Sequence, residues 1–176
     1  MEAWLLRASA AAATLGGIAL VTISAITVYS VVGRALPDWP SLAWWRPVRG
    51  DFELVEMGTA IAIFSFLPYA QLTRANVLVD VFTSGASPRA KSAMAVPANL
   101  LLTGIAALFS WRMAVATEAL MTSTYTQTTM MLRMPTWWGY LPATALMAFL
   151  TLVSAFTTWR ALDETLHGGE PPAPPA

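Results

Sequence analysis

The amino-acid sequence predicts an all-α integral membrane protein with four transmembrane helices. Of its 176 residues, 56% are hydrophobic and only 11% are charged, whereas soluble domains carry about 25% charged residues. The charges are spaced so that four long uncharged stretches remain, and a bilayer core needs about 17 to 25 apolar residues per helix. We expect one membrane domain over residues 1–165, with spans at about 9–32, 55–73, 93–112 and 135–159.

The first span lies in a stretch rich in alanine, valine and isoleucine. A cleaved signal peptide is the alternative, but the apolar core of such a peptide is only about 7 to 15 residues long. We therefore expect a retained helix. Two pairs of small residues four positions apart either let a neighbouring helix approach closely or occur by chance in an alanine-rich helix: Ala12 with Gly16, and Ala13 with Gly17.

The second span is short, and the guanidinium of Arg74 can lengthen it by reaching the lipid headgroups. Glu53 and Glu56 open this helix and share one face, because they lie three residues apart. Such a carboxylate pair can bind a metal ion or relay protons. The positive end of the helix dipole explains two acidic residues near a helix start more simply, and we favour this structural interpretation.

The connections between spans carry aromatic residues typical of the membrane surface. Between the third and fourth spans, the hydroxyl-rich residues 122–129 either extend the third helix beyond the bilayer or run along its surface. Pro135, Trp137 and Trp138 then mark the return of the chain into the membrane. Residues 166–176 are rich in proline and glycine, which predicts a disordered tail.

An even number of spans places both termini on the same side of the membrane. The positive-inside rule does not choose the side, because arginine and lysine divide equally between the two sides. The compact basic sequence SPRAK, residues 87–91, favours the cytoplasm for the loop that contains it. We therefore expect cytoplasmic termini.

Residue types required for catalysis or cofactor binding are missing from the predicted spans. The interiors of these spans hold no Asp, Glu, Lys, Arg or His, whereas an ion-coupled carrier normally keeps such a residue at membrane depth. The chain has no cysteine and one histidine, His167 in the tail, which excludes a thiolate metal site and a bis-histidine haem. We expect no enzyme, no cofactor or metal site in this chain, and no nucleic-acid partner.

A polar stretch with the sequence LTRANVLVDVF follows the second span. Asn76 and Asp80 lie four residues apart, so they share one face if this stretch is helical. We expect the second helix to end here on the cytoplasmic side, with Arg74 at the headgroups. Asp80 either caps the helix or pairs nearby, with Arg89 or Lys91 as the partner.

Four landmarks occur in order along the chain. The first helix ends in VYSVVGRALP, and an acidic residue, Glu53 or Glu56, opens the second. The second helix ends in QLTRANVLVDVF, and TTMMLRMPTWWGYLP precedes the last. This order resembles the small membrane subunit (Q-type, DctQ-like) of tripartite ATP-independent periplasmic (TRAP) transporters, over roughly Ile18 to Leu162. Asn76 stands where that family usually has histidine.

The resemblance implies a non-catalytic scaffold subunit of a Na⁺-coupled importer of small organic anions, either carboxylates or acid sugars, in the bacterial inner membrane. The partners it implies are a large polytopic permease subunit that holds the substrate and Na⁺ sites, a periplasmic substrate-binding protein and membrane lipids. The candidate structural or interface residues are Glu53, Glu56, Arg74, Asn76, Asp80, Pro135, Trp137 and Trp138.

Two alternatives from other functional classes remain. The first is a self-sufficient homo-oligomeric carrier or channel, and the missing ionisable residues within the spans count against it. The second is a membrane enzyme or a quinone or haem accessory, for which histidine and cysteine ligands are lacking.

Overall fold

The computed structural model describes residues 2–35, 45–73, 88–123 and 127–167, and four helices account for most of them. They are α1 (Glu2–Ala35), α2 (Asp51–Leu72), α4 (Pro88–Thr122) and α5 (Trp137–His167). Each contains a stretch long and apolar enough to cross a membrane, which confirms the predicted fold class. Each predicted span falls within one helix to within two residues.

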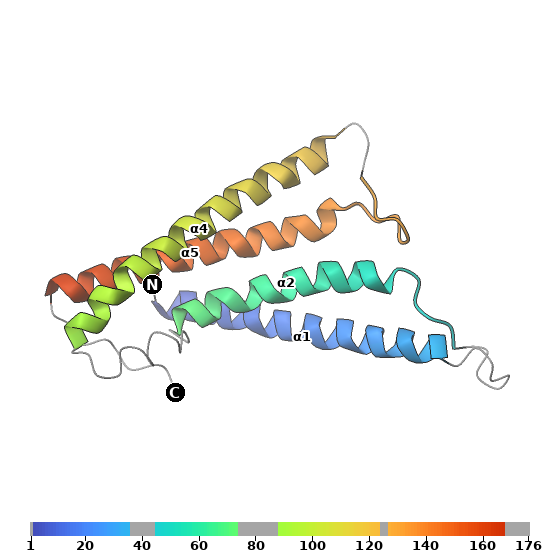
Figure 1. The fold of residues 1–176 in the computed structure, drawn as a ribbon, viewed down its shortest axis with the longest axis horizontal. Coiled ribbons are helices and arrows are strands. Elements are labelled where there is room, and N and C mark those ends of the chain that lie inside the picture. The colour runs from blue at the N-terminus through green and yellow to red at the C-terminus, as the bar shows by residue number, and fades with distance from the viewer. Residues whose placement is uncertain (1, 36–44, 74–87, 124–126, 168–176) are drawn as a thin grey trace.

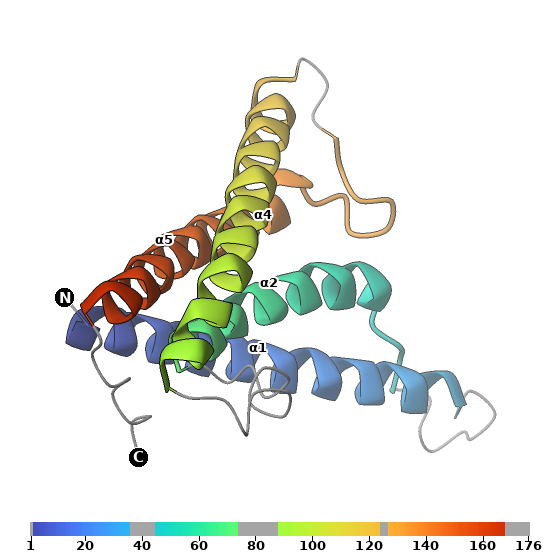
Figure 2. The same ribbon diagram turned by 60° about the vertical axis from the view of Figure 1, so that its left-hand side comes forward.

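The helices lie side by side in the order α4, α5, α2, α1 (Figure 1). Helix α1 packs along α2, α4 packs along α5, and contact between the two pairs is made chiefly by α2 and α5. Figure 2 shows that α4 is inclined steeply to α1, so the four helices do not form a parallel bundle. Helix α5 is the most enclosed, with 39% of its apolar window buried against 11–17% for the others.

Helices α1 and α2 approach closely at glycines. A Cβ on Gly16 would lie 2.6 Å from the Cβ of Ser65, and one on Gly58 would lie 2.5 Å from Cγ2 of Ile23. A Cβ on Gly17 would meet nothing within 4 Å. Of the two small-residue pairs in the first helix, the pair ending in Gly16 is therefore the one at the α1–α2 contact.

The packed core lies where α2, α4 and α5 meet. Ala106 of α4 is buried together with Met147 and Leu150 of α5, and Phe64 of α2 and Met113 of α4 pack against them. These side chains come from all three helices, so α5 is held on two sides.

The first turn of α1 is tied to the end of α5. The guanidinium of Arg160 pairs with the carboxylates of Glu2 and Glu164. These ends of the two helices therefore lie together, while their side of the membrane stays a prediction. Helix α5 runs to His167, and the rest of the predicted tail lies outside the described residues.

The hydroxyl-rich stretch does not continue α4, which ends at Thr122. The segment 127–136, called the anchored loop below, folds back on itself instead. Its two arms are joined by an antiparallel bridge between Thr128 and Pro135, and the N–H groups of Thr129 and Thr136 donate to the carbonyls of Met134 and Gln127, both at 2.9 Å.

Candidate functional site

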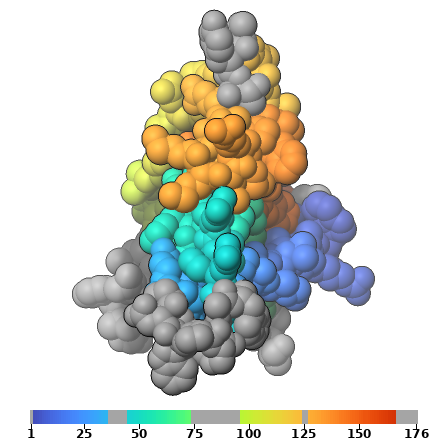
Figure 3. Space-filling view, turned by 90° about the vertical axis from the view of Figure 1, so that its right-hand side faces the viewer, coloured from blue at the N-terminus to red at the C-terminus, as the bar shows by residue number. Residues whose placement is uncertain are grey.

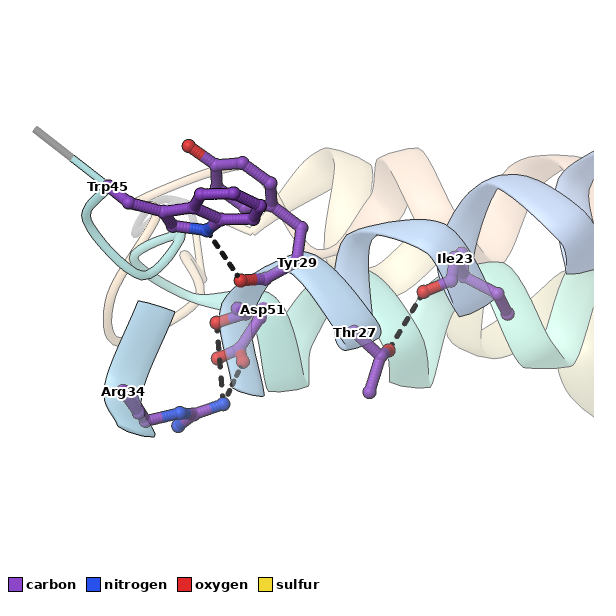
Figure 4. Close-up of polar contacts among 7 residues, drawn as sticks. Ile23, Thr27, Tyr29, Arg34, Trp45 and Asp51 are labelled. Carbon is purple, nitrogen blue, oxygen red and sulfur yellow. Dashed lines mark hydrogen bonds and ion pairs between the residues drawn. The ribbon is translucent and has the colours of Figure 1, made fainter. Parts of the chain in front are cut away.

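Two acidic side chains in the first turn of α2 hold neighbouring segments in place. Asp51, only 5% exposed, forms an ion pair with Arg34 in the last turn of α1 (Figure 4). The same guanidinium lies 5.2 Å from the centroid of the Phe52 ring and donates to Oγ of Ser30 at 3.4 Å. A buried carboxylate is tolerated when it is paired and hydrogen-bonded, so this contact fixes the end of α1 beside the start of α2.

The connection from α1 to α2 also packs against α1. The indole N–H of Trp45 donates to the backbone carbonyl of Tyr29 at 3.1 Å, and the two rings stack at 5.0 Å between centroids (Figure 4). A Cβ on Gly33 would lie 3.0 Å from the backbone nitrogen of Pro47, so the returning chain passes close to α1 at this glycine.

Glu53 joins α2 to the anchored loop. Its Oε1 accepts a hydrogen bond from the N–H of Met131 at 2.7 Å, and its Oε2 accepts one from the N–H of Leu132 at 2.9 Å. Both carboxylate oxygens are thus used by consecutive backbone donors. Hydrogen bonds to an ionised acceptor are shorter and stronger than neutral ones, which suits a carboxylate that binds a loop lying far away in the sequence.

Gly50 provides a second contact between α2 and the anchored loop. It precedes the helix with a φ of 74°, in the left-handed region, and its carbonyl accepts the N–H groups of Glu53 and Leu54. The side chain of Leu132 lies directly on it, because a Cβ there would be 2.6 Å from Leu132 Cγ. Figure 3 shows the loop, in orange, against the start of α2, in teal.

A second polar junction lies near the other end of α2. Gln71 is 5% exposed, and its side-chain amide donates to Oδ1 of Asn99 in α4 at 3.1 Å and to Oγ1 of Thr157 in α5 at 3.0 Å. One amide therefore joins three helices. Glu53 and Gln71 together fasten α2 to the α4–α5 pair near both of its ends.

The other candidate residues are placed as follows. Glu56 is exposed and has no hydrogen bond or ion pair with the described residues. Pro135 belongs to the anchored loop, and Trp137 and Trp138 begin α5 with their rings edge to face at 6.0 Å. Three predicted residues lie outside the described part of the chain: Arg74, Asn76 and Asp80.

The geometry gives Glu53 an architectural role. Its oxygens are engaged by backbone N–H groups, and no three His, Cys, Asp or Glu residues of the described ranges gather closely enough to hold a metal ion. Sequence reasoning missed Asp51, although an acidic residue in the first turn of a helix was a usable signal. It also missed Gln71, because a lone glutamine in an apolar run predicts no partner.

Comparison with known protein families matches residues 23–164 to tripartite ATP-independent periplasmic transporters, DctQ component. The chain belongs to this family. The DctQ match covers most of the 176 residues and includes both junctions of α2. The protein is therefore a multi-pass membrane component of a TRAP transporter and not an enzyme. No curated protein and no solved structure matches the chain.

Proposed function

We propose that this DctQ-family chain is the non-catalytic scaffold subunit of its transporter. In this role it binds a large polytopic permease subunit and holds it in the bacterial inner membrane while that partner moves substrate. The observation that carries the proposal is family membership together with the internal use of the polar side chains. Glu53, Asp51 and Gln71 all fasten one part of the chain to another.

A scaffold needs a fixed shape, and the contacts of α2 support one. Near its start, α2 is joined to α1 through Asp51 and to the anchored loop through Glu53. Near its end, Gln71 joins it to α4 and α5. Because the two helix pairs are fastened near both ends of α2, the chain resists hinge motion between them.

The wider proposal concerns the complex. We propose Na⁺-coupled uptake of small organic anions, with the substrate and Na⁺ sites in the large subunit and delivery by a periplasmic substrate-binding protein. Cytoplasmic termini would place the anchored loop and the start of α2 at the periplasmic face. The SPRAK sequence supports this orientation through its basic residues.

Co-purification and reconstitution test the proposal. The tagged chain is expressed with a TRAP large subunit from the same genome, and both are reconstituted with the binding protein in liposomes carrying a Na⁺ gradient. The expected result is a stable complex, and uptake that needs all three proteins. Uptake by this chain alone would contradict the scaffold role and favour the homo-oligomeric carrier. Failure of the two membrane chains to associate would also contradict it.

Two glutamates provide a matched pair of variants for the same assay. Glu53→Gln weakens the hold on the anchored loop, whereas Glu56→Gln changes an exposed side chain that has no partner among the described residues. We expect the first to reduce recovery of the complex and the second to leave it unchanged. Equal recovery for both would show that the fixed loop is unimportant for assembly.

A further inference from the structure

Helices α4 and α5 are joined by pairs of hydroxyl groups. Oγ1 of Thr103 lies 2.9 Å from Oγ1 of Thr158, and Oγ1 of Thr117 lies 2.9 Å from Oγ1 of Thr144. These contacts link the two helices at well-separated levels. Thr117 donates to the carbonyl of Met113 at 2.8 Å, which leaves Thr144 as the donor across the helices. Thr103 and Thr158 each lie 2.8 Å from a carbonyl of their own helix, so one of these hydroxyls donates there and the other donates across.

The two pairs belong to one antiparallel register. The steps from Thr103 to Thr117 and from Thr144 to Thr158 are both 14 residues. Halfway between them the same register places Ser110 opposite Thr151, and both side chains are half-buried. No hydrogen bond joins these two side chains within the described ranges, and the Thr151 hydroxyl donates to the carbonyl of Met147 in its own helix at 3.0 Å. Each helix therefore carries a hydroxyl residue at every seventh position of the shared face.

A seven-residue repeat is the period that keeps one side of a helix against a partner over several turns. In lipid there is no hydrophobic drive between helices, so packing and interhelical hydrogen bonds decide how they associate. The repeat is therefore placed where it can determine the pairing. We call its six residues the hydroxyl ladder: Thr103, Ser110, Thr117, Thr144, Thr151 and Thr158.

We propose that the hydroxyl ladder sets the register of α4 against α5 inside the membrane. A slip by one helical turn would separate all three pairs of the ladder, because most residues three or four positions away on this face are apolar. Ser154, and Asn99 and Tyr140 towards the ends of the face, are the exceptions, so such a slip would restore few polar contacts. A slip by one full repeat would be less costly, since it would still oppose two of the three hydroxyl levels. The ladder therefore needs a second element to exclude that slip.

Gln71 supplies this second element. Its amide reaches Asn99 on α4 and Thr157 on α5 at the same time. A slip of seven residues moves one helix along the other by about 10 Å, at a rise of roughly 1.5 Å per residue. No single side chain can then reach both partners. The ladder defines a repeating set of registers, and Gln71 selects one of them.

Cysteine cross-linking measures the register directly, because the chain has no native cysteine. The in-register pair is Ser110→Cys with Thr151→Cys, introduced together into the full chain in membranes. Ser110→Cys with Thr144→Cys, or with Thr158→Cys, reports a slip by one repeat in either direction. We expect oxidative cross-linking to be at least tenfold faster for the in-register pair. Equal rates, or a faster slipped pair, would overturn the proposal.

Removing the outer levels tests whether the hydroxyls cause the register. The variant Thr103→Val/Thr117→Val, with and without Gln71→Leu, is compared with Thr14→Val/Thr22→Val. The threonines of this control, on α1, bond only to carbonyls of their own helix. We expect the ratio of in-register to slipped cross-linking to fall at least fivefold in the first variant and further with Gln71→Leu, and to stay unchanged in the control.

Thr103→Ser/Thr117→Ser keeps the hydroxyls and guards against a loss of expression. It is expected to cross-link like the chain that keeps both threonines. If the valine variant fails to accumulate, normal accumulation and cross-linking of the serine variant still show that the hydroxyl groups are required. An unchanged ratio in the valine variants would overturn the proposal. The measurement uses this chain alone, so its failure would leave association with the large subunit untouched.

Discussion

Gly50 is the position at which a single methyl group should have the largest calculable effect. Its φ of 74° lies in the left-handed region, which costs an L-residue roughly 1–2 kcal/mol. A Cβ there would also stand 2.6 Å from Cγ of Leu132, well inside the carbon contact distance of about 3.5–4.0 Å. Overpacking of this kind costs about 1–3 kcal/mol, so Gly50→Ala should lower stability by about 2–5 kcal/mol.

The two parts of that cost can be separated by a second substitution. Leu132→Ala removes the atoms that the new methyl group would strike, so the double variant should keep only the backbone part, roughly 1–2 kcal/mol beyond Leu132→Ala alone. Gly104→Ala and Gly17→Ala are controls of opposite sign. Both are helical with nothing within 4 Å of an added Cβ, and replacing a mid-helix glycine should gain about 0.5–1 kcal/mol.

Reversible unfolding in mixed micelles, with SDS as denaturant and circular dichroism as the signal, gives the free energies. The contact between Leu132 and Gly50 is refuted if Gly50→Ala unfolds within about 0.5 kcal/mol of wild type, an effect expected of an unconstrained surface site. It is also refuted if Leu132→Ala fails to recover any of the loss. Either outcome would mean that the loop does not rest on the start of α2.

Three further expectations follow from single side chains. Glu53→Ala should speed amide hydrogen exchange at Met131 and Leu132, whose N–H groups lose their acceptor; unchanged exchange there would contradict the anchoring role. Ser154→Ala should leave stability unchanged or raise it by up to about 1 kcal/mol, because Oγ of Ser154 is buried without a hydrogen-bond partner among the described residues; a clear loss on unfolding would reveal a partner. Met130→Cys, at a residue 96% exposed in the anchored loop, should react with a membrane-impermeant maleimide from the periplasmic side, and labelling only from the cytoplasmic side would reverse the proposed orientation.

Hydropathy predicts the four helices well because long uncharged runs have few other stable structures in a membrane. It does not predict which helix is central. Helix α1 has the most apolar window of the four and α5 is more than twice as buried. In lipid an apolar side chain gains little by moving from the bilayer to a helix contact, so hydropathy carries little information about burial.

The candidate site shows the same limit at single residues. The position of Glu53 at a helix start predicts a structural carboxylate, but its partners are backbone N–H groups of a loop far away in the sequence. Backbone donors have no residue type, so no pattern identifies them. The spacing of the hydroxyl ladder, by contrast, is visible in the sequence, and only its pairing across α4 and α5 requires the structure.

The division of the molecule into two helix pairs has a consequence for its biogenesis. Helices α1 and α2 form one antiparallel hairpin, and α4 and α5 form another. Most of the contact between the two hairpins is made by α2 and α5. A membrane insertion machinery can therefore release the first hairpin into the lipid before the second is synthesised. The contacts of Glu53 and Gln71 form last, which predicts that the two halves, made as separate polypeptides, assemble into one subunit in the membrane.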